Sequence, residues 1–304
     1  MTVRPTTGEP VRLDGATATE LQRAGLPVRA PWWSTLALNG EGHRRLLREV
    51  HERHIAAGAQ VITANTFRCN PRALRRLGLD SAGLGWMVHA AVGVARAARS
   101  AAKAEDVLIA GAMAPVEDCY RPDLVPPDEE LRAEHRRLAA ELVGAGVDLV
   151  LVETMNRARE ARVALEQVRA AGGRAWVSFV CADGARLLSG EPLADAARAV
   201  ERDGAAATLV NCASLDDTET ALRVLRDACD GPVGVAPNLE DRGGIPRGRH
   251  VDRVLPAAVT PERFAERVAR WREESGVDIV GGCCGATPAH MAALHHAPAA
   301  PGAQ

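Results

Sequence analysis

Short β-branched apolar runs alternate with longer amphipathic stretches along the chain. Apolar runs of this kind indicate strands buried on both faces, and their alternation with helices indicates a parallel sheet. Eight strand–helix repeats in 304 residues predict an α/β fold, the (β/α)₈ or TIM barrel. The predicted strands are 11–15, 60–65, 107–113, 147–154, 175–181, 207–212, 232–237 and 277–283, and the helical patterns include 43–58, 128–146, 161–173 and 261–276.

A doubly wound open sheet is the structural alternative. Such a sheet more often carries a glycine-rich phosphate loop after its first strand, and "LDGATATE" at 13–20 does not fit G-x-G-x-x-G. No change of composition divides the chain, so a single domain is predicted over 1–304. Residues 237–256, rich in Gly, Pro and Arg, predict a surface loop after the seventh strand, and 297–304 predict a frayed tail.

Charge and cysteine content narrow the classes of function. The formal net charge is −2 with both signs interspersed, which gives no indication of nucleic acid or a membrane as partner. No apolar run approaches the ~20 residues of a membrane span, and the first residues lack the apolar core of a signal peptide, so a cytoplasmic location is expected. Seven cysteines without a secretion signal predict reduced thiols.

Polar residues stand at the predicted carboxyl ends of several strands, where barrel enzymes place their chemistry. Asp14 follows the first strand, Asn65 and Thr66 the second, and Glu153 the fourth. Three cysteines follow the sixth and eighth strands, namely Cys212, Cys283 and Cys284. We therefore expect two carboxylates and three thiols to meet on one rim. For the two carboxylates alone, a helix N-cap or a structural ion pair is an equal alternative.

Three thiols on one rim favour a soft, tetrahedral metal ion, and zinc is the first choice. Three protein ligands would leave one position open, as in catalytic zinc sites. Consecutive residues of a strand face opposite ways, so Cys283 and Cys284 reach one metal only if the backbone bends. We expect Gly281, Gly282 and Gly285 to permit that bend.

The alternative for any single cysteine is a small buried hydrophobe, and we assign that role to Cys229. Cys69, Cys119 and Cys181 also fall near strand ends, and we expect them to line the pocket without binding metal. A disulfide between the two adjacent cysteines would be strained and disfavoured in a reducing compartment.

Five motifs together resemble the homocysteine S-methyltransferase family. They are "LDGATATELQRAGL", "ITANTFRCNP", "LVETM", "LVNCAS" and "GGCCGATPAHMAAL", and they span nearly the whole chain. The resemblance implies a barrel that holds zinc through Cys212, Cys283 and Cys284. It also implies that Asp14 and Glu153 face the substrate's amino group, with the backbone of Gly15 and the hydroxyl of Thr66 beside its carboxylate.

The implied reaction is methyl transfer to the thiolate of homocysteine, giving methionine, with S-methylmethionine or S-adenosylmethionine as donor. Aromatic faces attract such cations, and in this aromatic-poor chain the candidates are Trp32, Trp33, Phe67 and Tyr120. A lid packed on the core is the alternative for the two tryptophans.

Departures from the family pattern leave the substrates open. Ala112 and Ala114 stand where the family tends to carry Ser and Gly. Another thiol or a selenol as acceptor, and a corrinoid protein or a betaine-type donor, are alternatives. A zinc- or thiol-binding protein without turnover is the alternative from another class. The partners expected are small molecules, and the chain is a candidate homo-oligomer.

Overall fold

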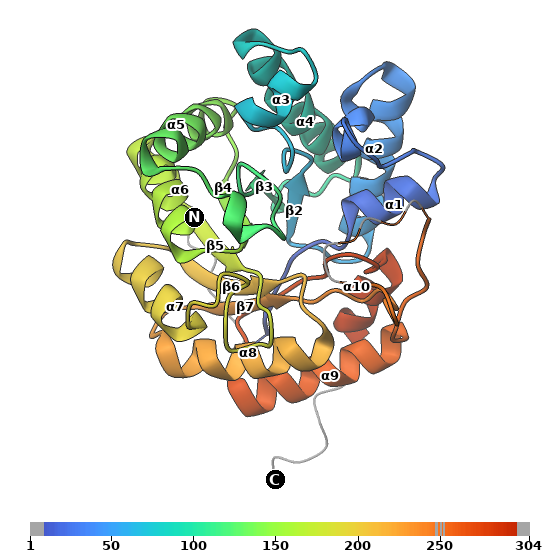
Figure 1. Ribbon diagram of the computed structural model, residues 1–304. Helices are drawn as coiled ribbons and strands as arrows, with labels where there is room; N and C mark the ends of the chain where they lie inside the picture. Colours follow the sequence, from blue (N-terminus) through green and yellow to red (C-terminus); the bar gives the residue numbers. More distant parts are fainter. Residues whose placement is uncertain (1–8, 247–248, 250, 252, 297–304) are drawn as a thin grey trace.

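Eight parallel strands form one sheet that closes into a barrel (Figure 1). The structure is a computed structural model that describes residues 9–246, 249, 251 and 253–296. The strands are β1 (Val11–Arg12), β2 (Val61–Ala64), β3 (Leu108–Met113), β4 (Leu149–Met155), β5 (Ala175–Phe179), β6 (Ala207–Asn211), β7 (Val233–Ala236) and β8 (Ile279–Val280).

Each strand pairs with its neighbours in the sequence, and β1 pairs with β8. A parallel bridge between Leu13 and Val61 joins β1 to β2 and closes the ring. The predicted α/β barrel is therefore confirmed, and the doubly wound sheet is excluded. The predicted tail at 297–304 lies outside the described residues, as do 247–248, 250 and 252 of the predicted loop.

Helices surround the strands (Figure 1). They are α1 (Thr17–Arg23), α2 (Glu41–Ala56), α3 (Pro71–Arg76), α4 (Ser81–Ala101), α5 (Asp128–Gly144), α6 (Ala158–Ala170), α7 (Leu193–Arg202), α8 (Leu215–Ala228), α9 (Pro261–Ser275) and α10 (Pro288–His296), with the short 3₁₀ helices η1 (Trp33–Leu38) and η2 (Pro122–Leu124). Asn70, Ser214 and Thr260 cap α3, α8 and α9 through side-chain oxygens that accept backbone N–H bonds. Left-handed glycines follow several other helices, for example Gly58 at φ +88°.

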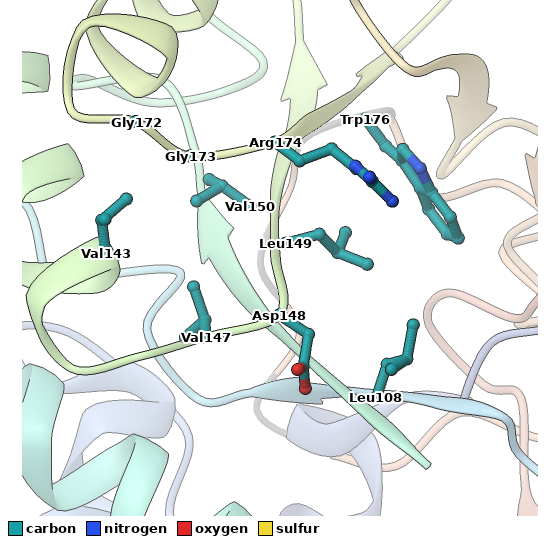
Figure 2. A pocket seen from close by; sticks show the side chains of 10 residues that line it. All are labelled: Leu108, Val143, Val147, Asp148, Leu149, Val150, Gly172, Gly173, Arg174 and Trp176. Carbon is teal, nitrogen blue, oxygen red and sulfur yellow. The ribbon is translucent and has the colours of Figure 1, made fainter. Parts of the chain in front are cut away.

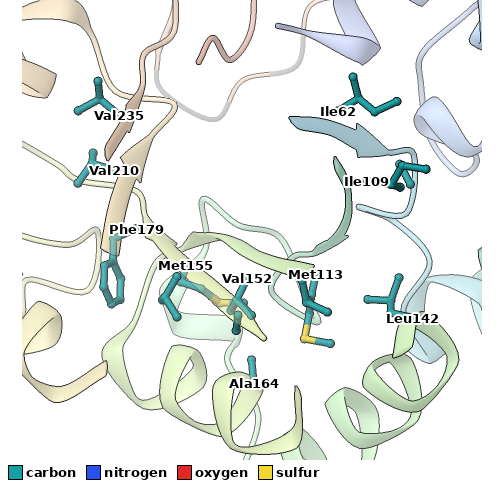
Figure 3. Close-up of a cluster of buried hydrophobic side chains, with 14 of the residues drawn as sticks. Ile62, Ile109, Met113, Leu142, Val152, Met155, Ala164, Phe179, Val210 and Val235 are labelled. Atoms are coloured by element: carbon teal, nitrogen blue, oxygen red, sulfur yellow. The ribbon is translucent and has the colours of Figure 1, made fainter. Parts of the chain in front are cut away.

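Side chains along each strand alternate between two apolar layers. Outward-facing residues, among them Ile62, Ile109 and Val210, pack between the strands and the helices (Figure 3). Inward-facing residues such as Val61, Leu149, Leu151, Trp176 and Leu209 fill the lower part of the barrel. Successive side chains of a strand point to opposite faces. The next inward side chain therefore lies two residues beyond the last inward residue of the apolar layer, toward the carboxyl end of the strand.

On four strands the next inward position is polar. These positions are Thr63 on β2, Glu153 on β4, Ser178 on β5 and Asn211 on β6. The barrel therefore has an apolar floor and a polar layer at the carboxyl ends of its strands. This polar layer is where the candidate site lies.

Candidate functional site: a three-cysteine cluster above the barrel floor

Cys212, Cys283 and Cys284 meet at the carboxyl end of the barrel. Their sulfur atoms lie within 4.8 Å of one another, with Sγ of Cys212 2.9 Å from that of Cys283 and 3.8 Å from that of Cys284. Two backbone bonds fix the double-cysteine turn against the loop after β7. The N–H of Cys283 donates to the carbonyl of Pro237, and the N–H of Leu239 donates to that of Cys284, both at 2.8 Å.

The glycines around the turn act differently from one another. Only Gly285 is left-handed, at φ +78°, so only there does the bend require glycine. A Cβ on Gly281 would lie 2.6 Å from Cβ of Leu13, and one on Gly282 would lie 2.2 Å from Cβ of Ala286. Gly281 and Gly282 contribute by their lack of a side chain, which allows Leu13 and Ala286 to approach the backbone closely.

Hydrogen bonds concentrate negative charge on Cys212. Bonds from Cys283, then Cys284 and Tyr120, hold the pKa of the Cys212 thiol well below its usual range, although burial opposes this. The hydroxyl of Tyr120 lies 3.3 Å from Sγ of Cys212. Since the Cys212 charge raises the pKa of Tyr120 well above its usual range, the tyrosine donates in this bond. One thiolate with two thiols beside it is a donor set that a divalent cation would complete by replacing protons.

Two carboxyl groups lie in the same polar layer. Asp14 accepts hydrogen bonds from the N–H and hydroxyl of Thr63, at 2.7 and 3.0 Å. Burial raises the pKa of Asp14 to about 6, with these bonds opposing the rise. Burial, together with the charges of Asp14 and Cys212, raises the pKa of Glu153 to about 8. No residue described in the structure donates a hydrogen bond to the Glu153 carboxylate, so this group is the one best placed to receive a cation.

Glu153 lies within β4, near the end of the predicted strand 147–154. The strand becomes irregular at the next residue. Thr154 is left-handed, at φ +57°, and the register of β4 shifts between Val152 and Met155. This bulge turns Met155 outward into the apolar layer and leaves Glu153 as the last inward side chain of the strand.

Asn211 connects the strands that carry Glu153 and Cys212. Its amide oxygen accepts from the N–H of Thr154 and the hydroxyl of Ser178, at 3.0 and 2.7 Å, and its amide nitrogen donates to Oγ1 of Thr154 at 2.8 Å. Cys212 follows directly and is itself left-handed, at φ +58°. Sequence reasoning missed Asn211 as a positioning residue, although its place on the inward face of β6 was a usable signal.

The residues predicted to hold a substrate carboxylate use their donors within the protein. The N–H of Gly15 donates to Nδ1 of His54 at 3.3 Å, and the Thr66 hydroxyl donates to the carbonyl of Ala112 at 2.8 Å. Asn65 donates from its amide to the carbonyl of Ser34 at 2.8 Å, which ties η1 to the end of β2. Their predicted roles stay predictions.

The aromatic candidates divide into three groups. Trp32 packs against the core, as the lid alternative expects. The guanidinium of Arg68 lies over the rings of both Trp33 and Phe67, 5.2 and 5.3 Å from their centroids. Tyr120 alone reaches the cluster directly, and this contact was not predicted.

The remaining cysteines belong to the apolar packing. Cys69, Cys181 and Cys229 lie in the main core, and Cys119 is also buried. Burial raises the pKa of Cys69 and of Cys119 to about 12, so both thiols stay protonated. All seven cysteines are free, which leaves no disulfide between Cys283 and Cys284.

A cavity lies near the opposite end of the barrel. Its volume is about 240 Å³, and Figure 2 shows Asp148, Arg174 and Trp176 among its lining residues, near the amino-terminal ends of β4 and β5. It is remote from the cysteines, and barrel enzymes place their catalytic groups at the carboxyl ends. The three-cysteine cluster is therefore the stronger candidate.

Comparison with known proteins identifies the family. Residues 11–297 match the family model described as Homocysteine S-methyltransferase. The chain belongs to this family. The homocysteine S-methyltransferase of Escherichia coli K12 is 32% identical over 93% of both chains. A selenocysteine Se-methyltransferase of Brassica oleracea var. italica is 26% identical over 95% of this chain and 89% of its own.

The structural comparison agrees. The metallated form of the homocysteine methyltransferase MmuM from Escherichia coli superposes with a TM-score of 0.82 at 30% identity, over 95% of this chain and 96% of that one. These matches confirm the predicted family and the predicted enzyme class, the methyltransferases of EC 2.1.1. Within the described part of the chain, every helix is too short or too polar to cross a membrane.

Proposed function

We propose that this chain is a zinc-dependent S-methyltransferase that transfers a methyl group from a sulfonium donor to the thiolate of homocysteine. The donors we favour are S-methylmethionine and S-adenosylmethionine, and the product from homocysteine is methionine. The observation that carries the proposal is the three-cysteine cluster placed above an unpaired carboxyl group. The family match and the metallated relative support it.

The cysteines fit zinc in number, chemistry and spacing. Zinc–sulfur bonds of about 2.3 Å in a tetrahedron separate the sulfurs by about 3.8 Å. Cys212 and Cys284 already have this separation, while Cys212 and Cys283 would have to move apart from 2.9 Å. When bound, zinc supplies a Lewis acid that keeps a substrate thiol deprotonated near neutral pH.

The residues around the cluster would bind and orient the amino acid. Glu153 would receive the substrate's ammonium group, because its partly buried carboxylate has no other cation or donor among the described residues. Asp14, held by Thr63, would add a second negative charge on the same side. Fixing the ammonium group fixes the position of the sulfur, which is where proximity contributes most to rate.

Gly15 and Thr66 keep their proposed place beside the substrate carboxylate, and each would exchange an internal partner for it. In the transfer itself, the substrate sulfur attacks the methyl carbon in line with the donor's carbon–sulfur bond. The electron pair of that bond stays on the donor sulfur, which becomes a neutral thioether.

A selenol acceptor is the second candidate, favoured by the similarity to the Brassica enzyme. A selenolate would occupy the same position and receive the methyl group in the same way. The single domain, the homo-oligomer and the cytoplasmic location stay predictions.

The test combines metal analysis with an activity assay on the reduced protein. We expect about one zinc per chain and formation of methionine from homocysteine with a sulfonium donor. Zinc without turnover on any sulfonium donor would refute the proposed donor class and favour a betaine-type or corrinoid donor. Faster turnover of selenocysteine than of homocysteine would assign the second candidate instead, and absence of zinc would remove the basis of both.

A further inference from the structure

Arg68 is a partly buried cation at the end of β2, on the side of the barrel that holds the candidate site. The N–H groups of its guanidinium donate no hydrogen bond to any described residue. It follows β2 and Phe67 directly. Among the residues that the structure describes, none forms a hydrogen bond or an ion pair with it. The next arginines along the chain differ sharply. Arg72 and Arg76 pair with Glu117, and Arg75 pairs with Glu134.

Two aromatic rings hold the Arg68 guanidinium in place. It lies over Trp33 and Phe67, with its central carbon 5.2 and 5.3 Å from the ring centroids. These are cation–π contacts, which hold the charged group without using its N–H donors. An arginine held in this way is preorganised for a bidentate bond to a planar anion.

The position of Arg68 relates these N–H groups to the reaction site. Arg68 follows β2, so it lies at the carboxyl ends of the strands, on the same side of the barrel as the cysteine cluster. Its charge also acts on the thiol of Cys119. Cys119 precedes Tyr120, whose hydroxyl lies 3.3 Å from Sγ of Cys212.

We propose that Arg68 recognises the carboxylate of an amino-acid substrate, with Trp33 and Phe67 holding its guanidinium. This inference rests on the proposed function, because it takes homocysteine and an amino-acid sulfonium as the substrates. Both carry a carboxylate, and the cation on the rim binds that group in one of them. It also accounts for a partly exposed arginine that lacks the acidic partner its neighbours have.

The test uses substrates that differ only in the carboxylate. One pair is S-methylmethionine and (3-aminopropyl)dimethylsulfonium, and the other is homocysteine and 3-aminopropanethiol. Wild-type protein, Arg68→Gln and Arg68→Lys are compared by kcat and KM on each. Arg75→Gln is the matched control, because that exposed arginine lies on α3 in an ion pair.

We expect Arg68→Gln to lower kcat/KM by about 10- to 100-fold for one carboxylated substrate, mainly through KM, as expected for a lost bond between charged groups. The same variant should leave the decarboxylated partner of that pair unchanged. Arg68→Lys should recover part of the loss, since lysine keeps the positive charge but lacks the two parallel N–H groups that form a bidentate bond. The pair that responds identifies whether the donor or the acceptor carries the recognised carboxylate.

Equal losses on both members of each pair, or no loss on any of them, would overturn the proposal. Calorimetric binding of homocysteine and 3-aminopropanethiol to the zinc-loaded protein provides a readout without turnover. If wild-type protein is inactive with every sulfonium, the proposed function fails. The ratio of the affinities for homocysteine and 3-aminopropanethiol, compared between wild type and Arg68→Gln, still tests whether Arg68 binds the carboxylate of the acceptor.

Discussion

Replacing Glu153 by glutamine tests whether this partly buried carboxyl group lacks a partner in the native protein. Its native pKa is about 8, raised first by burial and then by the charges of Asp14 and Cys212. In the unfolded chain the pKa of the group returns to its ordinary value of 4.5. Between these values the native carboxyl keeps a proton that the unfolded chain releases. Stability from this group is therefore full below pH 4.5 and is lost as the pH rises to 8.

The magnitude follows from proton linkage. Where the native state binds one proton more than the unfolded state, the free energy of unfolding falls by about 1.4 kcal/mol per pH unit. Integrated from pH 6 to pH 8 with the pKa values of Glu153, the loss is about 2 kcal/mol. This window lies above the pKa of about 6 that burial gives Asp14, so most of the change belongs to Glu153.

The assay is urea denaturation of substrate-free wild-type protein and Glu153→Gln at several pH values between 6 and 8. Glutamine does not titrate. Between pH 6 and pH 8, the free energy of unfolding of the variant should therefore rise by about 2 kcal/mol relative to that of the wild type. Cysteine titrations occur in both proteins and largely cancel in the difference. The control is Glu129→Gln, a change at an exposed glutamate of α5. Its free energy of unfolding should differ from that of the wild type by the same amount at every pH.

A constant difference between wild type and Glu153→Gln would refute the reasoning, because it would mean that the native carboxyl ionises as it does in the unfolded chain. Homocysteine provides a further check. If its ammonium group pairs with Glu153, saturating homocysteine should flatten the pH dependence of the wild type and leave that of the variant unchanged.

Four other substitutions test the construction of the site. Cys283→Ala should abolish zinc retention and turnover while circular dichroism shows an intact fold; full zinc occupancy would contradict the ligand assignment. Gly282→Ala should lower stability by about 1–3 kcal/mol in thermal unfolding, since the new Cβ would lie 2.2 Å from that of Ala286. Asn211→Ala should lower stability by about 2–4 kcal/mol, more than Ser178→Ala, which removes one of its three bonds. Tyr120→Phe should shift the sulfur-to-metal charge-transfer bands of the cobalt-substituted protein, and an unchanged spectrum would show that its hydroxyl does not act on Cys212.

The barrel and the meeting of the cysteines followed from the sequence because they depend on regular repetition. Parallel strands bring their carboxyl ends to one side, so residues distant in sequence must converge once the strands are recognised. Cys212 and Cys283 lie 71 positions apart, yet their sulfurs are 2.9 Å apart. No local interaction had to be known to predict that proximity.

Side-chain partners were less predictable, because each depends on contacts between separate elements. Gly15 and His54 are 39 positions apart, and no sequence motif indicates the hydrogen bond between them. Gly281 and Gly282 were assigned to a bend because the double cysteine requires one, whereas the packing of Leu13 and Ala286 against them decides their size. A sequence shows that glycine is present but does not show which neighbour excludes a side chain.

The two left-handed residues of the site show why its geometry belongs to the whole fold. Thr154 and Cys212 adopt φ values of +57° and +58°, a conformation that costs about 1–3 kcal/mol at residues other than glycine. Asn211 precedes Cys212, and its side chain bonds to both the N–H and the hydroxyl of Thr154, so it holds the left-handed residue of β4. The bulge at Thr154 leaves Glu153 inward, and the turn at Cys212 presents its sulfur to the other cysteines. Asn211 therefore ties the strand that carries the carboxylate to the strand that carries the thiolate, and binding of an amino acid would depend on both groups.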